Sequence, residues 1–233
     1  MRSSNLFAFT LVLVPFATLA HADVIAGDPA HPDPGTGLCV PFACFYQGEY
    51  QQVYSSSLFS GPFDITGLQF FDSIFAPTGR ASGSEVISLS TTSANWNTLS
   101  STFSANVGPT ATQVFNGTIG AARPFPGTLV LPFSTPFLYD PSKGNLLVDI
   151  QANIVVGGAV LYDTTGFGQP NNFEGVAYMG PAGVVVQSGY GLITDFQGAP
   201  VSSSSPEPSS ILLLTSAVGG LVYFARGRRR RNA

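Results

Sequence analysis

The chain is poor in charged residues, and basic residues are almost absent from its central part. Charged residues make up 9% of the 233 residues. Between Asp23 and Val201 only Arg80, Arg123 and Lys143 are basic, against twelve acidic residues, so this stretch carries a net charge of −9 while the whole chain carries −4. Because proteins bind nucleic acid through clustered Lys and Arg, this composition excludes nucleic acid as a partner of the central part.

Histidine is equally scarce, and the common catalytic motifs are missing. His21 and His31 are the only histidines, and neither stands where a positioned general base is expected. The sequence has no GxSxG, HExxH, GxxxxGKS/T or GxGxxG motif. A glycosidase needs only two carboxylates, so Glu49, Glu85 and Glu174 leave a secreted hydrolase as a third interpretation, with solvated acids as the alternative. We predict no catalytic residue and no cofactor.

The amino end has the features of a secretory signal peptide. Arg2 precedes an apolar stretch from Leu6 to Leu19, which is followed by the small-residue site Ala20-His21-Ala22. This order of charge, apolar run and small residues is typical of a leader that is cleaved after export. Residues 1–22 are therefore predicted to be removed, with Asp23 as the first residue of the mature protein.

The carboxyl end carries three features in a fixed order. A Pro206-Glu207-Pro208 tripeptide is followed by an apolar run from Ile211 to Ala225, and the chain closes with a basic cluster. The cluster consists of Arg226, Arg228, Arg229, Arg230 and Arg231. In this order the segment 206–233 resembles the PEP-CTERM sorting signal of exosortase substrates from Gram-negative bacteria. The resemblance implies that an exosortase cuts near the tripeptide, so that the mature protein loses its anchor.

The physical properties of the tail agree with a membrane span. Ser209 to Ala225 gives 17 residues, at the lower edge of the roughly 17 to 25 that cross a hydrocarbon core. The arginines are expected to stay on the cytoplasmic side. The alternative is an ordinary single-span anchor that is never processed.

Between the two ends, apolar residues occur in short runs typical of strands. In the clearest run, Leu146 to Ile154, apolar residues occupy every second position, as in a half-buried strand. About ten such runs, separated by turn residues and without an amphipathic helix, predict an all-β fold, an antiparallel β-sandwich of the jelly-roll-like kind. Pro132, Pro136 and Pro141 are expected to flank strands. The other candidate strands are 51–59, 65–71, 87–90, 112–119, 129–133, 159–163, 175–179, 184–187 and 192–196.

The two cysteines stand close together in a segment that export would place in an oxidising compartment. Cys39 and Cys44 are predicted to form a disulfide. So small a loop gains only about 2 to 3 kcal/mol in the chain-entropy model. Metal ligation together with His31, or two isolated thiols, are the alternatives.

Two kinds of ligand site remain as candidates. Trp96 lies in a polar stretch, and Tyr46, Tyr50 and Tyr54 stand elsewhere, so exposed rings would serve as a glycan platform; the alternative is that Trp96 plugs the sandwich and the tyrosines lie along a strand. Oxygen ligands for Ca²⁺ are the second kind, although none follows a known loop, and turn formation is the alternative role. These oxygens belong to Asp140 with Asp149, or to Asp163 with Asn171 and Asn172.

The sequence thus predicts four parts: a signal peptide (1–22), an exported domain (23–201), a Ser-rich linker (202–205) and a sorting signal (206–233). We expect a non-catalytic protein of the cell surface or extracellular matrix that resides in the inner membrane only before processing. Its expected partners are the exosortase and the membrane, and exopolysaccharide if the domain is a glycan-binding module. That module is the leading alternative function.

Overall fold

The computed structural model describes residues 23–32, 37–73, 81–120, 126–156, 158, 160–166 and 171–201. Several predicted features lie outside these residues: the signal peptide with Ala20 and Ala22, the Pro206-Glu207-Pro208 tripeptide and the arginine cluster. None of the helices in the described part of the chain is long and apolar enough to cross a membrane.

Strands dominate the described residues, and every pair of neighbouring strands is antiparallel. The predicted all-β, antiparallel class is therefore confirmed. Three single-turn 3-10 helices, η1 (Ser56–Leu58), η2 (Phe103–Ala105) and η3 (Pro141–Lys143), interrupt the strands. The strands are β1 (Val24–Ala26), β2 (Gly37–Leu38), β3 (Gln47–Tyr54), β4 (Phe63–Asp72), β5 (Ser82–Thr92), β6 (Thr112–Ile119), β7 (Gly127–Tyr139), β8 (Asn145–Val156), β9 (Tyr162–Thr165), β10 (Glu174–Gly180), β11 (Gly183–Ser188), β12 (Gly191–Leu192) and β13 (Thr194–Pro200).

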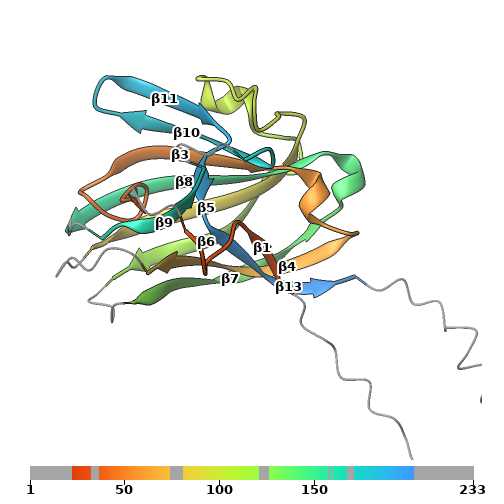
Figure 1. The fold of residues 1–233 in the computed structure, drawn as a ribbon, viewed down its shortest axis with the longest axis horizontal. Coiled ribbons are helices and arrows are strands. Elements are labelled where there is room, and N and C mark those ends of the chain that lie inside the picture. The colour runs from red at the N-terminus through yellow and green to blue at the C-terminus, as the bar shows by residue number, and fades with distance from the viewer. Residues whose placement is uncertain are drawn as a thin grey trace, which may run out of the picture. The chain divides into compact units, whose positions relative to one another are not determined.

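The strands form two large sheets and one small one. The six-stranded sheet has the order β11-β10-β3-β8-β5-β6, the four-stranded sheet the order β1-β13-β4-β7, and the small sheet the order β12-β9-β2. The two large sheets lie in separate layers, with β10, β3, β8 and β5 in one and β4, β7, β13 and β1 in the other (Figure 1). The main hydrophobic core contains residues of both sheets. The inner face of a sheet is defined as the one whose side chains contribute to this core.

The alternating apolar residues of strand β8 determine which of its faces packs into the core. Its alternate residues Leu146, Val148, Ile150, Ala152 and Ile154 are all buried, as the alternation of the sequence predicts. Burying one such side chain stabilises the fold by roughly 1.5 to 3 kcal/mol relative to leaving it exposed. A slip of one residue would turn this whole row to the other face, so the pattern fixes the register of β8 between β3 and β5.

Aromatic rings fill the space between the two large sheets. Phe59 contacts Phe63, Tyr139 and Phe196 at centroid distances of 5.9, 4.8 and 5.4 Å, all in edge-to-face arrangements. Tyr54 of the opposite sheet meets Phe196 at 4.8 Å, again edge to face. Such pairs contribute about 0.5 to 1.5 kcal/mol beyond the burial of area. The aromatic cluster therefore links β3 of the six-stranded sheet to β4, β7 and β13 of the other.

Several strands differ from expectation: those expected over 87–90 and 129–133 extend to Ser82–Thr92 and Gly127–Tyr139, and three others are shifted or divided. The first strand of the six-stranded sheet, expected over 51–59, spans Gln47–Tyr54, because the Ser55 side chain accepts a hydrogen bond from the Ser57 N–H and starts η1. The strand expected over 159–163 is shifted to Tyr162–Thr165. The run expected over 192–196 is divided between β12 and β13 at Ile193, whose N–H donates to the Asp163 carbonyl.

The prediction that prolines flank the strands is wrong for two of the three. Pro132 and Pro136 lie inside β7, whereas Pro141 begins η3. Strand β7 is the last strand of the four-stranded sheet, so a missing N–H on its free side breaks no ladder. Strand β7 therefore continues through Pro132 and Pro136 to Tyr139.

Candidate functional site

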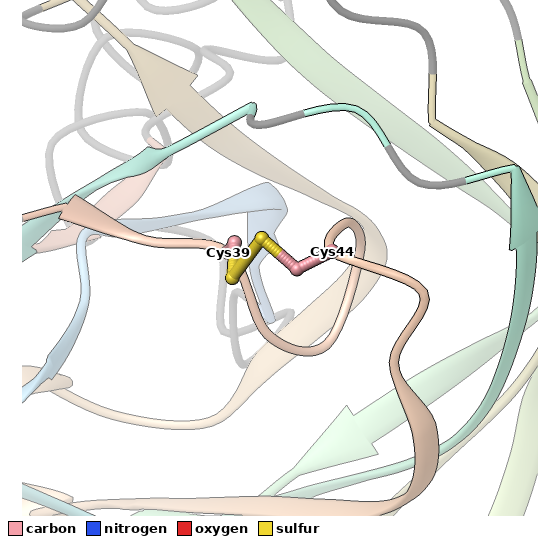
Figure 2. Close-up of a disulfide and its surroundings, with 2 residues drawn as sticks. All are labelled: Cys39 and Cys44. Carbon is pink, nitrogen blue, oxygen red and sulfur yellow. A yellow bond between two sulfur atoms is a disulfide. The ribbon is translucent and has the colours of Figure 1, made fainter.

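The disulfide is the first predicted feature that the structure brings together. Cys39 and Cys44 are bonded to each other, with their Cα atoms 5.7 Å apart, and close a short loop before β3 (Figure 2). Inside the loop the Ala43 N–H donates to the Cys39 carbonyl at 2.7 Å. The ring of Phe42 packs on Phe70 at 4.7 Å, so the disulfide loop is fastened to β4 of the four-stranded sheet. Because both sulfurs are used in this bond, neither is available as a metal ligand.

The three tyrosines named as glycan contacts do not form a surface platform. Tyr50 and Tyr54 are 1% and 0% exposed on the inner face, and Tyr46 is 7% exposed. The Tyr46 hydroxyl donates to the Glu49 carbonyl at 2.5 Å and accepts from the Met179 N–H at 3.1 Å. The alternation of β3 explains the burial, since residues 50, 52 and 54 share the face that packs against the core.

The three glutamates named as hydrolase candidates do not converge either. Glu85 on β5 and Glu174 on β10 are 0% exposed and face inward, whereas Glu49 on β3 lies on the outer face. Strands β3 and β8 separate β10 from β5, so Glu85 and Glu174 are at least about 14 Å apart at the usual strand spacing. This exceeds the separation of about 5 to 9.5 Å that a glycosidase carboxyl pair requires.

A different carboxyl pair lies on the outer face of the six-stranded sheet. Asp149 on β8 stands directly opposite Gln51 on β3 and Ser88 on β5, and Glu49 is its diagonal neighbour on β3. Burial, and after it the charge and hydrogen bond of Glu49, raises the pKa of Asp149 to about 7. The Gln51 side chain hydrogen-bonds to Glu49 at 3.1 Å. The pair therefore places an acid that holds its proton more tightly than usual next to a second carboxyl group.

The loop between β5 and β6 covers one end of this outer face. Gln51 anchors it: its Nε2 donates to the Phe103 carbonyl at 3.2 Å, and its Oε1 accepts from Asn106 Nδ2 at 2.9 Å. Leu99 of the same loop packs on Val53 and Leu147, a small second core outside the main one. The loop thus forms a fixed border along the outer ends of β3 and β8.

Trp96 belongs to this loop and not to the core. It is half-buried, and its carbonyl lies against the Cα of Gly175 on β10, where any Cβ would collide with it. The expectation that Trp96 plugs the sandwich is therefore wrong, because the loop lies over the outer face of β10 and β3. Beyond the loop the outer face is exposed, at Gln151 and Asn153 on β8 and Ser84 on β5.

The outer face as a whole offers hydrogen-bonding groups beside an indole. Amides, hydroxyls and the Glu49–Asp149 pair line three neighbouring strands, and Trp96 stands at their border. We call this surface the outer polar face; it consists of Ser84, Ser88, Glu49, Gln51, Asp149, Gln151, Asn153 and Trp96. Its exposed members, Ser84, Gln151 and Asn153, fit a hydroxyl-rich ligand, since their side chains donate to and accept from hydroxyls and an aromatic ring stacks on sugar.

A second polar cluster is buried on the inner side, around Gln52 of β3. The Gln52 side-chain amide makes two hydrogen bonds to the main chain of Leu192. Gln52 Nε2 donates to the Leu192 carbonyl at 3.0 Å, and Gln52 Oε1 accepts from the Leu192 N–H at 3.1 Å. A Cβ at Gly191 would collide with Gln52 Nε2, so the approach requires glycine there. The cluster thus joins the six-stranded sheet to the small sheet through β12.

Glu174 completes this inner cluster. Its Oε2 accepts from Gln52 Nε2 at 2.7 Å, and its Oε1 accepts from Asn171 Nδ2 at 2.9 Å and from the Thr165 hydroxyl. Burial raises the pKa of Glu174 to about 7 against the opposing effect of these three donors. The arrangement is structural in character, because every donor comes from within the fold.

The candidate Ca²⁺ ligands have other roles. Asp140 accepts from the Ser142 N–H and hydroxyl and starts η3, while Asp163 accepts from the Ser73 N–H and hydroxyl. Asn171 bonds to Thr165 and Glu174. The described residues contain no group of three or more His, Cys, Asp or Glu side chains that would hold a metal ion.

Comparisons with protein-family models, with curated protein sequences and with solved structures returned no match.

Sequence reasoning named Trp96 but missed the Glu49–Asp149 pair. The two residues are far apart in the sequence, and only the β3–β8 register brings them together. A partial signal was present, because Glu49 and Gln51, like Asp149 and Gln151, alternate with apolar or aromatic residues. That alternation places each pair on the outer face, but it does not say which strands are neighbours.

Proposed function

We propose that the chain is an exported, non-catalytic protein of the cell surface or extracellular matrix, sorted and processed by an exosortase. The sequence of residues 206–233 carries this proposal, because a tripeptide, an apolar run and an arginine cluster follow one another there. One structural feature supports it. The Cys39–Cys44 disulfide suits an oxidising compartment outside the cytoplasm.

In this proposal the exported part is an antiparallel, jelly-roll-like β-sandwich. Its support is the packing of the six-stranded sheet over the four-stranded sheet around a shared core. Strands distant in the sequence are neighbours, such as β3 with β8 and β4 with β13. The last strand ends at Pro200, so residues 201–205 span at most about 3.3 to 3.6 Å each, or roughly 18 Å, before the tripeptide.

Replacing Pro206-Glu207-Pro208 by three alanines is expected to abolish processing. The exosortase would lose the residues it recognises while the membrane span and the arginines stay intact, so the uncut protein accumulates in the membrane fraction. The measurement is the ratio of uncut to cut protein on immunoblots of membrane and medium. Ser202-Ser203-Ser204 changed to three alanines is the matched control, three residues of the same length of chain that leave the tripeptide unchanged. Release of the alanine-tripeptide variant at the normal rate would contradict the proposal.

A glycan-binding module of the exopolysaccharide matrix is the second candidate function. The outer polar face favours it, since exposed amides and hydroxyls of the six-stranded sheet follow the loop that carries Trp96. Trp96 lies near Val53 of β3, while Gln151 and Asn153 lie opposite Glu49 and Gln47, roughly 13 to 20 Å further along the strands. In this function Trp96 stacks on one sugar ring, and Gln151 and Asn153 bond to hydroxyls of other rings of the same polysaccharide.

Trp96→Ala is expected to weaken retention on isolated exopolysaccharide by about tenfold or more, since an aromatic stacking partner contributes on the order of 1 to 3 kcal/mol. The measurement is co-sedimentation of the purified protein with the polysaccharide. Phe45→Ala is the matched control, because Phe45 is an exposed ring, 62% accessible, just before the start of β3, whereas the loop that carries Trp96 lies near the other end of β3. Equal retention of the folded Trp96→Ala variant and the unchanged protein would remove this second function.

A further inference from the structure

The first residue of the predicted mature protein lies beside the last strand of the fold. Strand β1 pairs with β13, with Val24 opposite Phe196 and Ile25 opposite Asp195. Asp23 immediately precedes this pairing, and its Oδ1 accepts a hydrogen bond from the Gly198 N–H at 3.2 Å. The two ends of the described domain therefore meet at β1 and β13, which lie next to each other in Figure 1.

Asp195 is a buried acid without a matching cation at this place. It is 6% exposed, and its Oδ1 is buried with no hydrogen-bond partner. Directly opposite it the register places Ile25 on β1 and Gln69 on β4, both uncharged. Burial, and after it the negative charge of Asp23, raises the pKa of Asp195 to about 6. A buried carboxylate oxygen without a donor needs a cation or a proton to be stable.

Strand geometry brings Asp23 within reach of Asp195. Residues 23 and 25 of one strand and residues 195 and 197 of the other point to the same face, because side chains alternate. Asp23 and Asp195 are diagonal neighbours across the pair, at a Cβ separation of roughly 7 Å. Because Ile25 lies opposite Asp195, the main-chain nitrogen of Asp23 lies at the level of Gln197. The Asp195 carboxylate therefore reaches this nitrogen only when the start of β1 turns toward Asp195 and the Asp195 side chain rotates with it.

We propose that cleavage after Ala22 creates the missing cation: the new α-ammonium of Asp23 pairs with the buried carboxylate of Asp195 and fastens β1 to β13. The step is a hydrolysis by the peptidase that removes the leader. Water adds to the Ala22 carbonyl, the bond from that carbonyl carbon to the Asp23 nitrogen breaks, Ala22 leaves as a carboxylate, and the nitrogen becomes an ammonium.

With this ion pair, firm attachment of β1 to β13 depends on removal of the leader. Before cleavage the Asp23 nitrogen is an uncharged amide, and Asp23 and Asp195 are two acids that repel each other. After cleavage the same residue carries a positive charge, which attracts the Asp195 carboxylate. Because β1 has only three residues, few ladder bonds hold it, and an ion pair is a large part of its attachment. This inference rests on the proposed export and removal of the leader.

The titration of a single amine tests the proposal. Lys143 is the only lysine of the chain and is exposed on η3, so in a Lys143→Arg background the α-amine is the only amine of the exported protein. Reductive methylation with ¹³C-formaldehyde labels it, and its NMR shift against pH gives its pKa. Intact mass of the same sample shows whether the chain starts at Asp23.

The α-amine pKa is expected about one unit above the ordinary 7.7 to 8.0, because two carboxylates favour the charged form. Asp195→Asn, which keeps the shape and removes the charge, is expected to return it to the ordinary range. Asp28→Asn is the matched control, since Asp28 is an exposed acid of the same amino-terminal segment, bonded to His31 at 2.7 Å, and its loss should leave the amine unchanged.

A second measurement does not depend on the asparagine variant being perfectly folded. Acetylation of the α-amine in the Lys143→Arg protein is expected to lower the folding equilibrium constant about threefold to tenfold, as for loss of a partly buried ion pair, and to have no effect in Asp195→Asn. A start at Asp23 with an α-amine of ordinary pKa in both proteins overturns this inference alone. A chain that does not start at Asp23 overturns it together with removal of the leader at this site.

Discussion

Replacing Glu85 with methionine is expected to stabilise residues 23–201 at neutral and alkaline pH and to make their stability less dependent on pH, above all between pH 7 and pH 9. Glu85 is 0% exposed on the inner face of β5, opposite Ala152 of β8, and neither of its carboxyl oxygens has a hydrogen-bond partner. Methionine has a similar volume and no polar atoms, so it removes an unsatisfied group that costs about 1 to 3 kcal/mol.

The direction of the pH dependence follows from the burial of Glu85. Burial raises its pKa from 4.5 to about 9, so the folded protein keeps a proton that the unfolded chain releases above pH 4.5. The contribution of this group to stability is fully present below pH 4.5 and is lost as the pH rises to about 9, at up to about 1.4 kcal/mol per pH unit. Burial raises the pKa of the nearby Tyr46 phenol to about 12, so that group stays neutral throughout.

Three other acids act in the same direction over lower ranges. The pKa values of Asp149 and Glu174 are raised to about 7 and that of Asp195 to about 6, mainly by burial. The free energy of unfolding should therefore be highest near pH 4 to 5 and fall towards pH 9. Many proteins are most stable at higher pH, where their paired carboxylates are charged.

Urea unfolding of residues 23–201 at pH 5, 7 and 9 measures this effect. The Glu85→Met curve should separate from that of the unchanged domain by an amount that grows from pH 5 to pH 9, and Glu85→Gln should follow the same trend. Asp140→Asn is the control, because Asp140 is partly exposed at the start of η3 and its variant should run parallel to the unchanged domain. A stability that rises between pH 5 and pH 9 would show that Glu85 is not held protonated.

Replacing Glu174 with alanine is expected to destabilise the domain by about 3 to 5 kcal/mol, as when one partner of a buried polar network is removed. The variant removes one acceptor each from Gln52 Nε2, Asn171 Nδ2 and the Thr165 hydroxyl. A loss of this size is a large part of the roughly 5 to 15 kcal/mol that is typical of a folded domain, so the midpoint of urea unfolding should fall well below that of the unchanged domain.

Combining Gln52→Leu with Glu174→Ala tests whether the two side chains stabilise the domain through the same hydrogen-bond network. Gln52→Leu removes the amide that bridges Glu174 and Leu192, so Gln52→Leu and Glu174→Ala together should cost clearly less than the sum of the single changes. Ser84→Ala, on the exposed side of β5, is the control and should change stability by less than about 0.5 kcal/mol. Additive losses would mean that the two side chains act independently.

The sequence predicts the inner face better than the outer one. Strict alternation from Leu146 to Ile154 identifies a half-buried strand and its core side, and the run 112–119 coincides with β6. Burial of every second apolar residue is a local property of the chain, which a pattern of period two reports directly. For the same reason Tyr50 and Tyr54 are recognisable as neighbours on one face of β3.

Features that depend on contacts between distant segments are not visible in the sequence. The loop from Ser93 to Ala111 has no periodicity that predicts its position over β3 and β10, and so the place of Trp96 follows only from the structure. Glu85 also breaks the apolar pattern of its strand, since charged residues normally mark a solvent face. Its burial is imposed by the register with β8 and β6.

The intact mass of the mature protein, recovered separately from membranes and from the medium or matrix, tests the proposed sorting most directly. The prediction is a species in the medium or matrix that starts at Asp23 and ends near Pro206 to Pro208, with a mass that includes the Cys39–Cys44 bond. A species that retains Arg226 to Ala233 and is found only in membranes would contradict it, and would make the tail an ordinary anchor.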